Sequence, residues 1–198
     1  MDEKIFTGFV ILLDKKVEAV AKSAYTKISG KFETFYNLSK FYPHITLYQA
    51  KFKPDKIEIL KEEFKKLLKG ISNFKISMNG LEFFQNYIFW NCAINENLKN
   101  LHEKVLRSMS KYHIKSEPNV NLDEKMKENF LKYGYPLAIK LYKPHITITA
   151  IKSKIDASKA MQTALPLLNV AEFMADKFAV CLLSHAGEAI EILETVEI

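Results

Sequence analysis

Hydrophobic and polar residues follow one another along this chain in patterns that predict short strands separated by amphipathic helices. In segment 15–29, Val17, Ala21 and Ala24 recur at helical spacing, whereas the largely apolar run 5–13 is typical of a strand. The same reasoning predicts strands at 5–13, 43–52, 74–84 and 87–94, helices at 15–29, 56–68, 98–112 and 157–168, and a loop or short helical turn at 32–40. The mixture of elements favours an α+β fold.

One part of this pattern occurs twice. The tetrapeptide Pro-His-Ile-Thr stands at 43–46 and again at 144–147, each time followed by an apolar residue. Further residues match at the same spacing: Lys51 with Lys152, Asp55 with Asp156, and Asn86 with Gly187. Each Asp precedes a predicted helix, where it is expected to cap free amides, and Asn86 and Gly187 lie where a hairpin turn needs positive φ. The sequence therefore predicts a duplicated unit of strand, helix and hairpin.

The repeated tetrapeptides place chemistry on one face of two strands. Side chains two residues apart share a strand face, so His44 projects with Thr46, and His145 projects with Thr147. Two such strands facing each other would form a cleft in which imidazoles serve as general acid and general base while hydroxyls hold a phosphate. A purely structural repeat would explain the apolar positions, but it would not explain why His and Thr recur with them.

These two motifs, His44-Ile45-Thr46-Leu47 and His145-Ile146-Thr147-Ile148, resemble the signature of the 2H phosphoesterase superfamily. Within that superfamily, the chain resembles the branch of RNA 2',3'-cyclic phosphodiesterases, which are also called 2'-5' RNA ligases. The resemblance implies one bilobal domain over 1–198, with pseudo-twofold duplication, two antiparallel sheets flanked by helices, and a central cleft.

The activity implied by the resemblance is metal-independent hydrolysis of a 2',3'-cyclic phosphate or a related RNA-derived phosphodiester. His44 would be the acid and His145 the base, with Thr46 and Thr147 on the phosphate. No cofactor is expected, and the partner would be RNA, an oligonucleotide or a cyclic nucleotide. One alternative is a phosphodiesterase for 2',5'-oligoadenylate or a cyclic oligonucleotide signal. Others are a catalytically idle RNA-binding module and a structural protein, but the complete set of His and Thr favours an enzyme.

Other candidates follow from position. Tyr48, Lys143 and Thr149 are expected on the cleft face as substrate-binding residues, with Tyr48 stacking on a base and Lys143 near the phosphate. The remaining histidines have no motif around them. His102 and His113 are expected at the surface, and a structural role is expected for His185. Phe89 and Trp90 lie in an apolar strand and are expected in the core.

Composition adds limits. The formal charge of +6 suits a polyanionic ligand, and neither motif is accompanied by a His-x-His pair or a carboxylate cluster that would indicate a metal. Cys92 and Cys181 lie in apolar runs and are expected to be buried free thiols. No run is long enough to cross a membrane, and 5–13 is a poor signal peptide. The expectation is a cytoplasmic monomer without a membrane partner.

The second half carries extra residues within 114–140, just before its motif. Insertions into a repeated scaffold often carry specificity, so this segment is expected to select the substrate beyond the reacting phosphate. The candidates for contacting a nucleic-acid chain are Lys115, Lys125, Lys127, Lys132, Lys140, Tyr133 and Tyr135.

Overall fold

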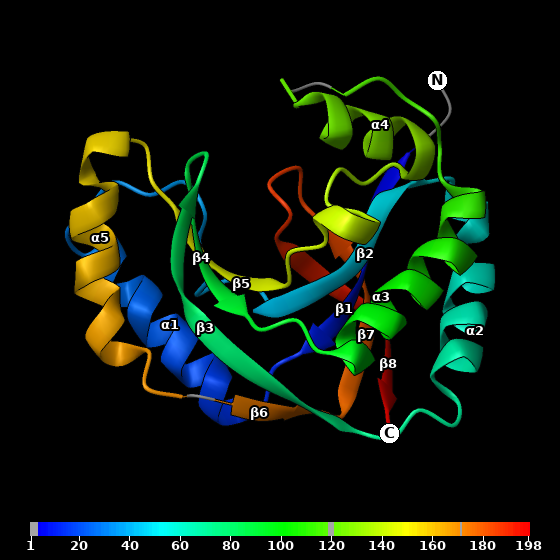
Figure 1. Ribbon diagram of the computed structural model, residues 1–198, viewed down its shortest axis with the longest axis horizontal. Helices are drawn as coiled ribbons and strands as arrows, with labels where there is room; N and C mark the ends of the chain where they lie inside the picture. The colour runs from blue at the N-terminus through cyan, green and yellow to red at the C-terminus, as the bar shows by residue number, and fades with distance from the viewer. Residues whose placement is uncertain (1–3, 119–120, 171) are drawn as a thin grey trace.

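The computed structural model describes residues 4–118, 121–170 and 172–198 (Figure 1). The strands are β1 (Ile5–Leu12), β2 (His44–Phe52), β3 (Phe74–Phe84), β4 (Tyr87–Cys92), β5 (His145–Ala150), β6 (Glu172–Ala175), β7 (Lys177–Leu183) and β8 (Ala189–Glu197). The α-helices are α1 (Lys15–Ser29), α2 (Ile57–Leu68), α3 (Glu96–Met109), α4 (Glu124–Tyr133) and α5 (Ala157–Ala164). The helices and strands predicted from the pattern are thus present, with boundaries shifted by a few residues.

All eight of these strands join one curled antiparallel sheet in the order β6-β3-β4-β5-β2-β1-β7-β8. The expectation of two sheets is therefore corrected. The reason is the pairing of Ile45 in β2 with Ile146 in β5, which joins the two halves at their motif strands. Outward from this pair, the two halves of the sheet are arranged alike. On one side β2 is followed by β1, β7 and β8, and on the other side β5 is followed by β4, β3 and β6.

The helices pack on the face of the sheet that carries the core. Helix α1 contacts β5 and α5 contacts β3, while α3 contacts β2 and α2 contacts β8. In Figure 1, α1 and α5 lie together on one side of the molecule and α2 and α3 on the other, with α4 apart from both pairs. Each of the four packed helices buries an apolar stripe in one continuous core. A fully buried aliphatic side chain there contributes about 1.5–3 kcal/mol.

Each motif strand contains a β-bulge at the same place in the repeat. Strand β1 pairs Phe9 with Tyr48 and Val10 with Thr46, which leaves Leu47 as the extra residue. Strand β4 likewise pairs Ile88 with Thr149 and Phe89 with Thr147, which leaves Ile148 extra. A bulge inserts one residue and so reverses which side chains face the core. After the bulge, each side chain in both strands therefore faces the side of the sheet opposite to the one expected for an uninterrupted strand.

Two details of the repeat differ from expectation. Helices α2 and α5 each follow a short 3₁₀ turn, and neither Asp55 nor Asp156 forms a capping hydrogen bond with a described residue. Side-chain caps occur instead at helices α1, α3 and α4, where they are supplied by Asp14, Asn95 and Asp123. In the first hairpin, positive φ falls on Gln85 (58°) rather than on Asn86, whereas Gly187 has the expected positive φ of 83°.

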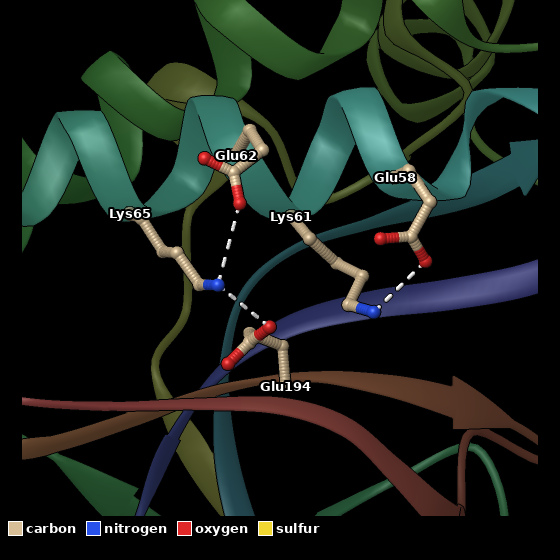
Figure 2. Close-up of polar contacts among 5 residues, drawn as sticks. All are labelled: Glu58, Lys61, Glu62, Lys65 and Glu194. Carbon is tan, nitrogen blue, oxygen red and sulfur yellow. Dashed lines mark hydrogen bonds and ion pairs between the residues drawn. The ribbon is translucent and has the colours of Figure 1, made fainter.

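One ion pair connects α2 to the edge strand β8, and two more lie within α2 (Figure 2). Lys65 Nζ lies 2.8 Å from a carboxylate oxygen of Glu194 and 3.4 Å from one of Glu62, and Lys61 pairs with Glu58 at 2.9 Å. The interaction with Glu194 is the largest cause of the raised pKa of Lys65. Because water screens exposed ion pairs, these contacts orient the helix more than they stabilise it.

His102 is fully buried, which corrects its expected place at the surface. Its Nδ1 lies 2.6 Å from the carbonyl oxygen of Leu47, the bulged residue of β2, and its Nε2 accepts the Ile139 amide at 3.0 Å. Its ring also stacks on Tyr142, with centroids 3.7 Å apart. The imidazole thus joins the bulge to the segment that leads into β5, and burial lowers its pKa to about 4.

This lowered pKa predicts a loss of stability in acid. The folded state holds His102 neutral down to about pH 4, whereas the unfolded chain takes up the proton near pH 6.5. Stability from this group is therefore present above pH 6.5 and is lost as pH falls towards 4, by up to about 3 kcal/mol. We expect the advantage of the wild type over His102→Gln to shrink across this window in urea unfolding. An advantage that stays constant between pH 7 and 4 would contradict the assignment.

Candidate active site

The two motif histidines lie on adjacent central strands and face one cleft. His44 begins β2 and His145 begins β5, and both rings line a cavity of about 240 Å³ together with Thr46 and Thr147. The intervening residues Ile45 and Ile146, as well as Leu47 and Ile148 at the bulges, are fully buried in the core. Burial of these apolar residues therefore turns the imidazoles and hydroxyls to the opposite face.

The histidines are held in the same way. His44 Nδ1 lies 2.8 Å from the carbonyl oxygen of Tyr42, and His145 Nδ1 lies 2.7 Å from that of Lys143. A carbonyl oxygen can only accept, so Nδ1 of each ring carries the hydrogen. In the neutral ring, Nε2 then carries the free lone pair. Both imidazoles therefore present to the cleft a nitrogen that can accept a proton or, once charged, return it.

Burial sets the protonation of this pair. It lowers the pKa of His44, and it lowers the pKa of His145 to about 4. The charges of His44 and Lys143 lower the pKa of His145 further, while Glu82 acts in the opposite direction. Because a charge on His44 disfavours a charge on His145, the arrangement disfavours protonation of both rings at once.

A row of side chains supports His145 from the second half of the sheet. Its ring stacks on Phe89 with centroids 3.7 Å apart and planes 25° apart. Next to it, Glu82 accepts a hydrogen bond from Asn91 at 2.8 Å and forms an ion pair with Lys143. Since Lys143 also supplies the carbonyl that holds His145, this ion pair helps to fix the backbone on which the ring depends.

The threonines have different surroundings. The Thr147 side chain is hydrogen-bonded to the hydroxyl of Tyr36, which is almost fully buried. Burial raises the pKa of this hydroxyl far above its usual range, and the hydrogen bond with Thr147 lowers it in part. On the other strand, Tyr142 donates at 3.1 Å to the backbone carbonyl of Thr46. Each motif strand is thus braced by a tyrosine from elsewhere in the fold.

The structure places the other sequence candidates differently. Tyr48 and Thr149 are fully buried, because the bulges turn both onto the core face; their expected place in the cleft is corrected. The Tyr48 hydroxyl donates to the Tyr133 carbonyl at 2.6 Å, and Thr149 donates to the Tyr36 carbonyl at 3.1 Å. Lys143 is half-exposed beside the cleft and lines a neighbouring cavity of about 530 Å³.

Several cleft residues were not expected from the sequence. Phe89 is buried as expected, yet it also lines the cleft, and His185 contributes from the β7–β8 turn. Gln49 also lines the cleft, a position that strand alternation gives only when the bulge is known. Trp90 is in the core as expected, His113 is half-buried, and Cys92 and Cys181 are buried free thiols.

The described part of the chain lacks two kinds of feature. Residues 4–118, 121–170 and 172–198 contain no group of three or more His, Cys, Asp or Glu side chains placed to hold a metal ion. Over the same residues, every helix is too short or too polar to cross a membrane.

Comparison with known proteins identifies the family of this chain. The family model of the 2'-5' RNA ligase superfamily matches residues 17–188, so the chain belongs to that superfamily. The resemblance to the 2H phosphoesterases is thereby confirmed, and membership supports a phosphoesterase with an RNA-related role. Among curated proteins, none matches this sequence.

Solved structures share the fold at low sequence identity. TT0787 of Thermus thermophilus is 17% identical with a TM-score of 0.62, over 98% of this chain and 97% of that one. Escherichia coli LigT complexed with phosphate is 10% identical with a TM-score of 0.55, over 99% and 98%. Kluyveromyces marxianus Usb1 is 12% identical with a TM-score of 0.51, over 100% and 99%. At these identities the likeness concerns the fold alone.

The hydrogen bonds to Nδ1 give a prediction that needs no substrate. At pH 7, ¹⁵N-detected NMR should find His44 and His145 neutral and protonated at Nδ1, because a carbonyl accepts from each. On acidification, both rings should take up a proton below pH 6.5, His145 near pH 4. Signals would be assigned with the single variants His44→Ala and His145→Ala. An Nε2–H tautomer in either ring would contradict the geometry.

Proposed function

We propose that this protein is a phosphodiesterase that opens a 2',3'-cyclic phosphate, or a related RNA-derived phosphodiester, by two-histidine general acid/base catalysis without a metal. The observation that carries the proposal is the matched pair of imidazoles, each fixed through Nδ1 and each presenting Nε2 to a cleft shared with two threonines. The family supports the same chemistry. E. coli LigT, which shares the fold, has been crystallised with phosphate and with 3'-AMP.

In the proposed reaction, water attacks phosphorus while His145 Nε2 accepts its proton. The bond from phosphorus to one ribose oxygen breaks, and His44 Nε2 protonates that departing oxygen. The product is a phosphomonoester, and the two imidazoles return to their starting states by exchanging protons with solvent. His145 suits the role of base, because the neighbouring charges of His44 and Lys143 help to keep it neutral.

The threonine hydroxyls complete the site in this proposal. Thr46 and Thr147 donate to the non-bridging oxygens of the phosphate. These hydrogen bonds hold the phosphate in line between the two histidines. The hydrogen bond between the Thr147 side chain and the Tyr36 hydroxyl holds the threonine in place. The stacking of His145 on Phe89 keeps the base in place during the proton transfer.

Substitution of the four motif side chains tests the mechanism. His44→Ala and His145→Ala should each lower kcat on a 2',3'-cyclic nucleotide by about 10²–10⁴-fold, measured with a chelator present.

Thr46→Val and Thr147→Val keep the shape but remove a hydroxyl, and they should cost about 10–10³-fold, mainly in kcat. Circular dichroism and thermal unfolding serve as controls for folding. A histidine variant with near-normal turnover would overturn the mechanism, and tight binding without hydrolysis by the wild type would indicate an RNA-binding module.

The lowered pKa values predict an acidic optimum for the free enzyme. One imidazole must be charged and the other neutral, so kcat/KM should peak between the two free-enzyme pKa values, both of which lie below 6.5. Above the higher value, kcat/KM should fall about tenfold per pH unit. The bound phosphodiester is negative and favours the imidazolium, so the kcat profile should lie at higher pH than the kcat/KM profile. A kcat/KM that stays flat up to pH 8 would be inconsistent with this pair.

A further inference from the structure

A second cavity, of about 170 Å³, opens from the catalytic cleft. The two share the lining residues Phe6, Gln49, Tyr135, Pro136 and His185, so they form one continuous hollow. The second cavity lies beyond Thr46 along β2, on the side away from His44. A substrate whose phosphate lies between the histidines could therefore continue into it.

The floor of this cavity is a consequence of the bulge in β2. After Leu47 and Tyr48 turn into the core, Gln49 and Lys51 return to the cleft face, in line with His44 and Thr46. Phe6 lies beside Lys51 as its partner in β1. An amide, a cation and an aromatic ring thus stand together at this end of the cleft.

The opposite wall comes from the extra segment 114–140 and is held close to the sheet. The Ile114 amide donates to the Lys51 carbonyl at 2.8 Å, which brings the side chains of Ser116 and Glu117 to the cavity. Gly134, with φ of 71°, ends α4 at the sheet, where a Cβ would lie 2.9 Å from the His113 ring and 3.1 Å from Ala50 Cβ. Only glycine permits this approach without strain.

The repeat supplies a direct comparison. The positions equivalent to Gln49 and Lys51 in β5 and just beyond it are Ala150 and Lys152, and neither of them lines the cleft. The amide of Phe35 donates to the Ala150 carbonyl at 3.0 Å, and Glu33 forms an ion pair with Lys152. By contrast, Lys51 forms no ion pair with any residue in the described ranges. The two ends of the repeat therefore differ: Gln49 and Lys51 line a cavity that adjoins the cleft, whereas Ala150 and Lys152 line neither cavity.

We propose that this second cavity binds the nucleotide next to the reacting one, so that the preferred substrate is an oligonucleotide rather than a mononucleotide. The inference rests on the proposed function. Lys51 would meet the internucleotide phosphate, Phe6 and Phe130 would contact the face of the base, and Gln49 and Ser116 would bond its polar edge. A carboxylate also lines the cavity, that of Glu117, which is exposed and can accept from amino groups of a base.

This proposal revises the role expected of segment 114–140. The segment supplies a wall rather than the positive charge. Lys115, Lys125, Lys127 and Lys132 are exposed, and none of them lines either part of the hollow. Lys140 lines the cavity beside Lys143 instead. Tyr135 lines the cavity but is buried, so it shapes the wall and leaves little ring surface for a base to stack on.

The test compares Lys51→Met with its matched control Lys152→Met. Two substrates are used: a dinucleotide that ends in a 2',3'-cyclic phosphate, and the corresponding cyclic mononucleotide. The ratio of their kcat/KM values should fall about tenfold in Lys51→Met and stay at the wild-type value in Lys152→Met. The slope of log KM for the dinucleotide against log salt should also decrease by about 0.7 in Lys51→Met alone, as expected for the loss of one phosphate contact.

The outcomes separate the subsite from the chemistry. Damage to folding would lower both rates and leave the ratio unchanged, so an unchanged ratio in Lys51→Met overturns the subsite. An equal fall of the ratio in Lys152→Met also overturns it, since the effect would then be one of overall charge. If the wild type hydrolyses neither substrate, the proposed function fails. The subsite is then judged by calorimetry with the uncleaved dinucleotide: a Kd about tenfold weaker in Lys51→Met supports it, and an equal Kd or no binding rejects it.

Discussion

The contact between β2 and β5 at Ile45 and Ile146 is the constraint on which the site depends. Both isoleucines are fully buried, and each is flanked by a histidine and a threonine that must then face the other way. Because this contact joins the two halves of one sheet, the same apolar packing that forms the core also brings the two imidazoles to one cleft. Placement of the proposed catalytic groups is thus a direct result of folding.

Burial of the two histidines lowers their pKa values and so disfavours the charged form that a general acid needs. Removal from water disfavours the charged form of both rings, and a charge on His44 further disfavours a charge on His145. Hydrogen bonds from Nδ1 to the carbonyls of Tyr42 and Lys143 offset part of this cost and fix the free nitrogen. An anionic phosphate between the rings would restore one proton, so the proposed substrate itself supplies the charge that makes the acid competent.

The paired bulges give a symmetric sheet two different ends. Each sends the residue after the motif into the core, and Tyr48 and Thr149 there bond the chain segments that cover their own ends of the sheet. In β5 that segment bonds to Ala150, which is fully buried, whereas in β2 Gln49 and Lys51 line a cavity together with Ile114, Ser116 and Glu117. Two matching motif strands can therefore hold the proposed catalytic groups in the same way and still have different surroundings at their far ends.

The sequence by itself determined the elements, the repeat, the family and the four polar side chains at the centre, because strand alternation and an identical tetrapeptide depend only on neighbouring residues. It did not determine that the two halves form one sheet, that the bulges bury Tyr48 and Thr149, or that His102 lies in the core as a bridge from Leu47 to Ile139. A bulge adds one residue without changing composition or period enough to be recognised, and a buried histidine has the same letter as an exposed one. Only tertiary packing decided these points, because they depend on which distant backbone groups need a hydrogen-bond partner and on which strand edges meet.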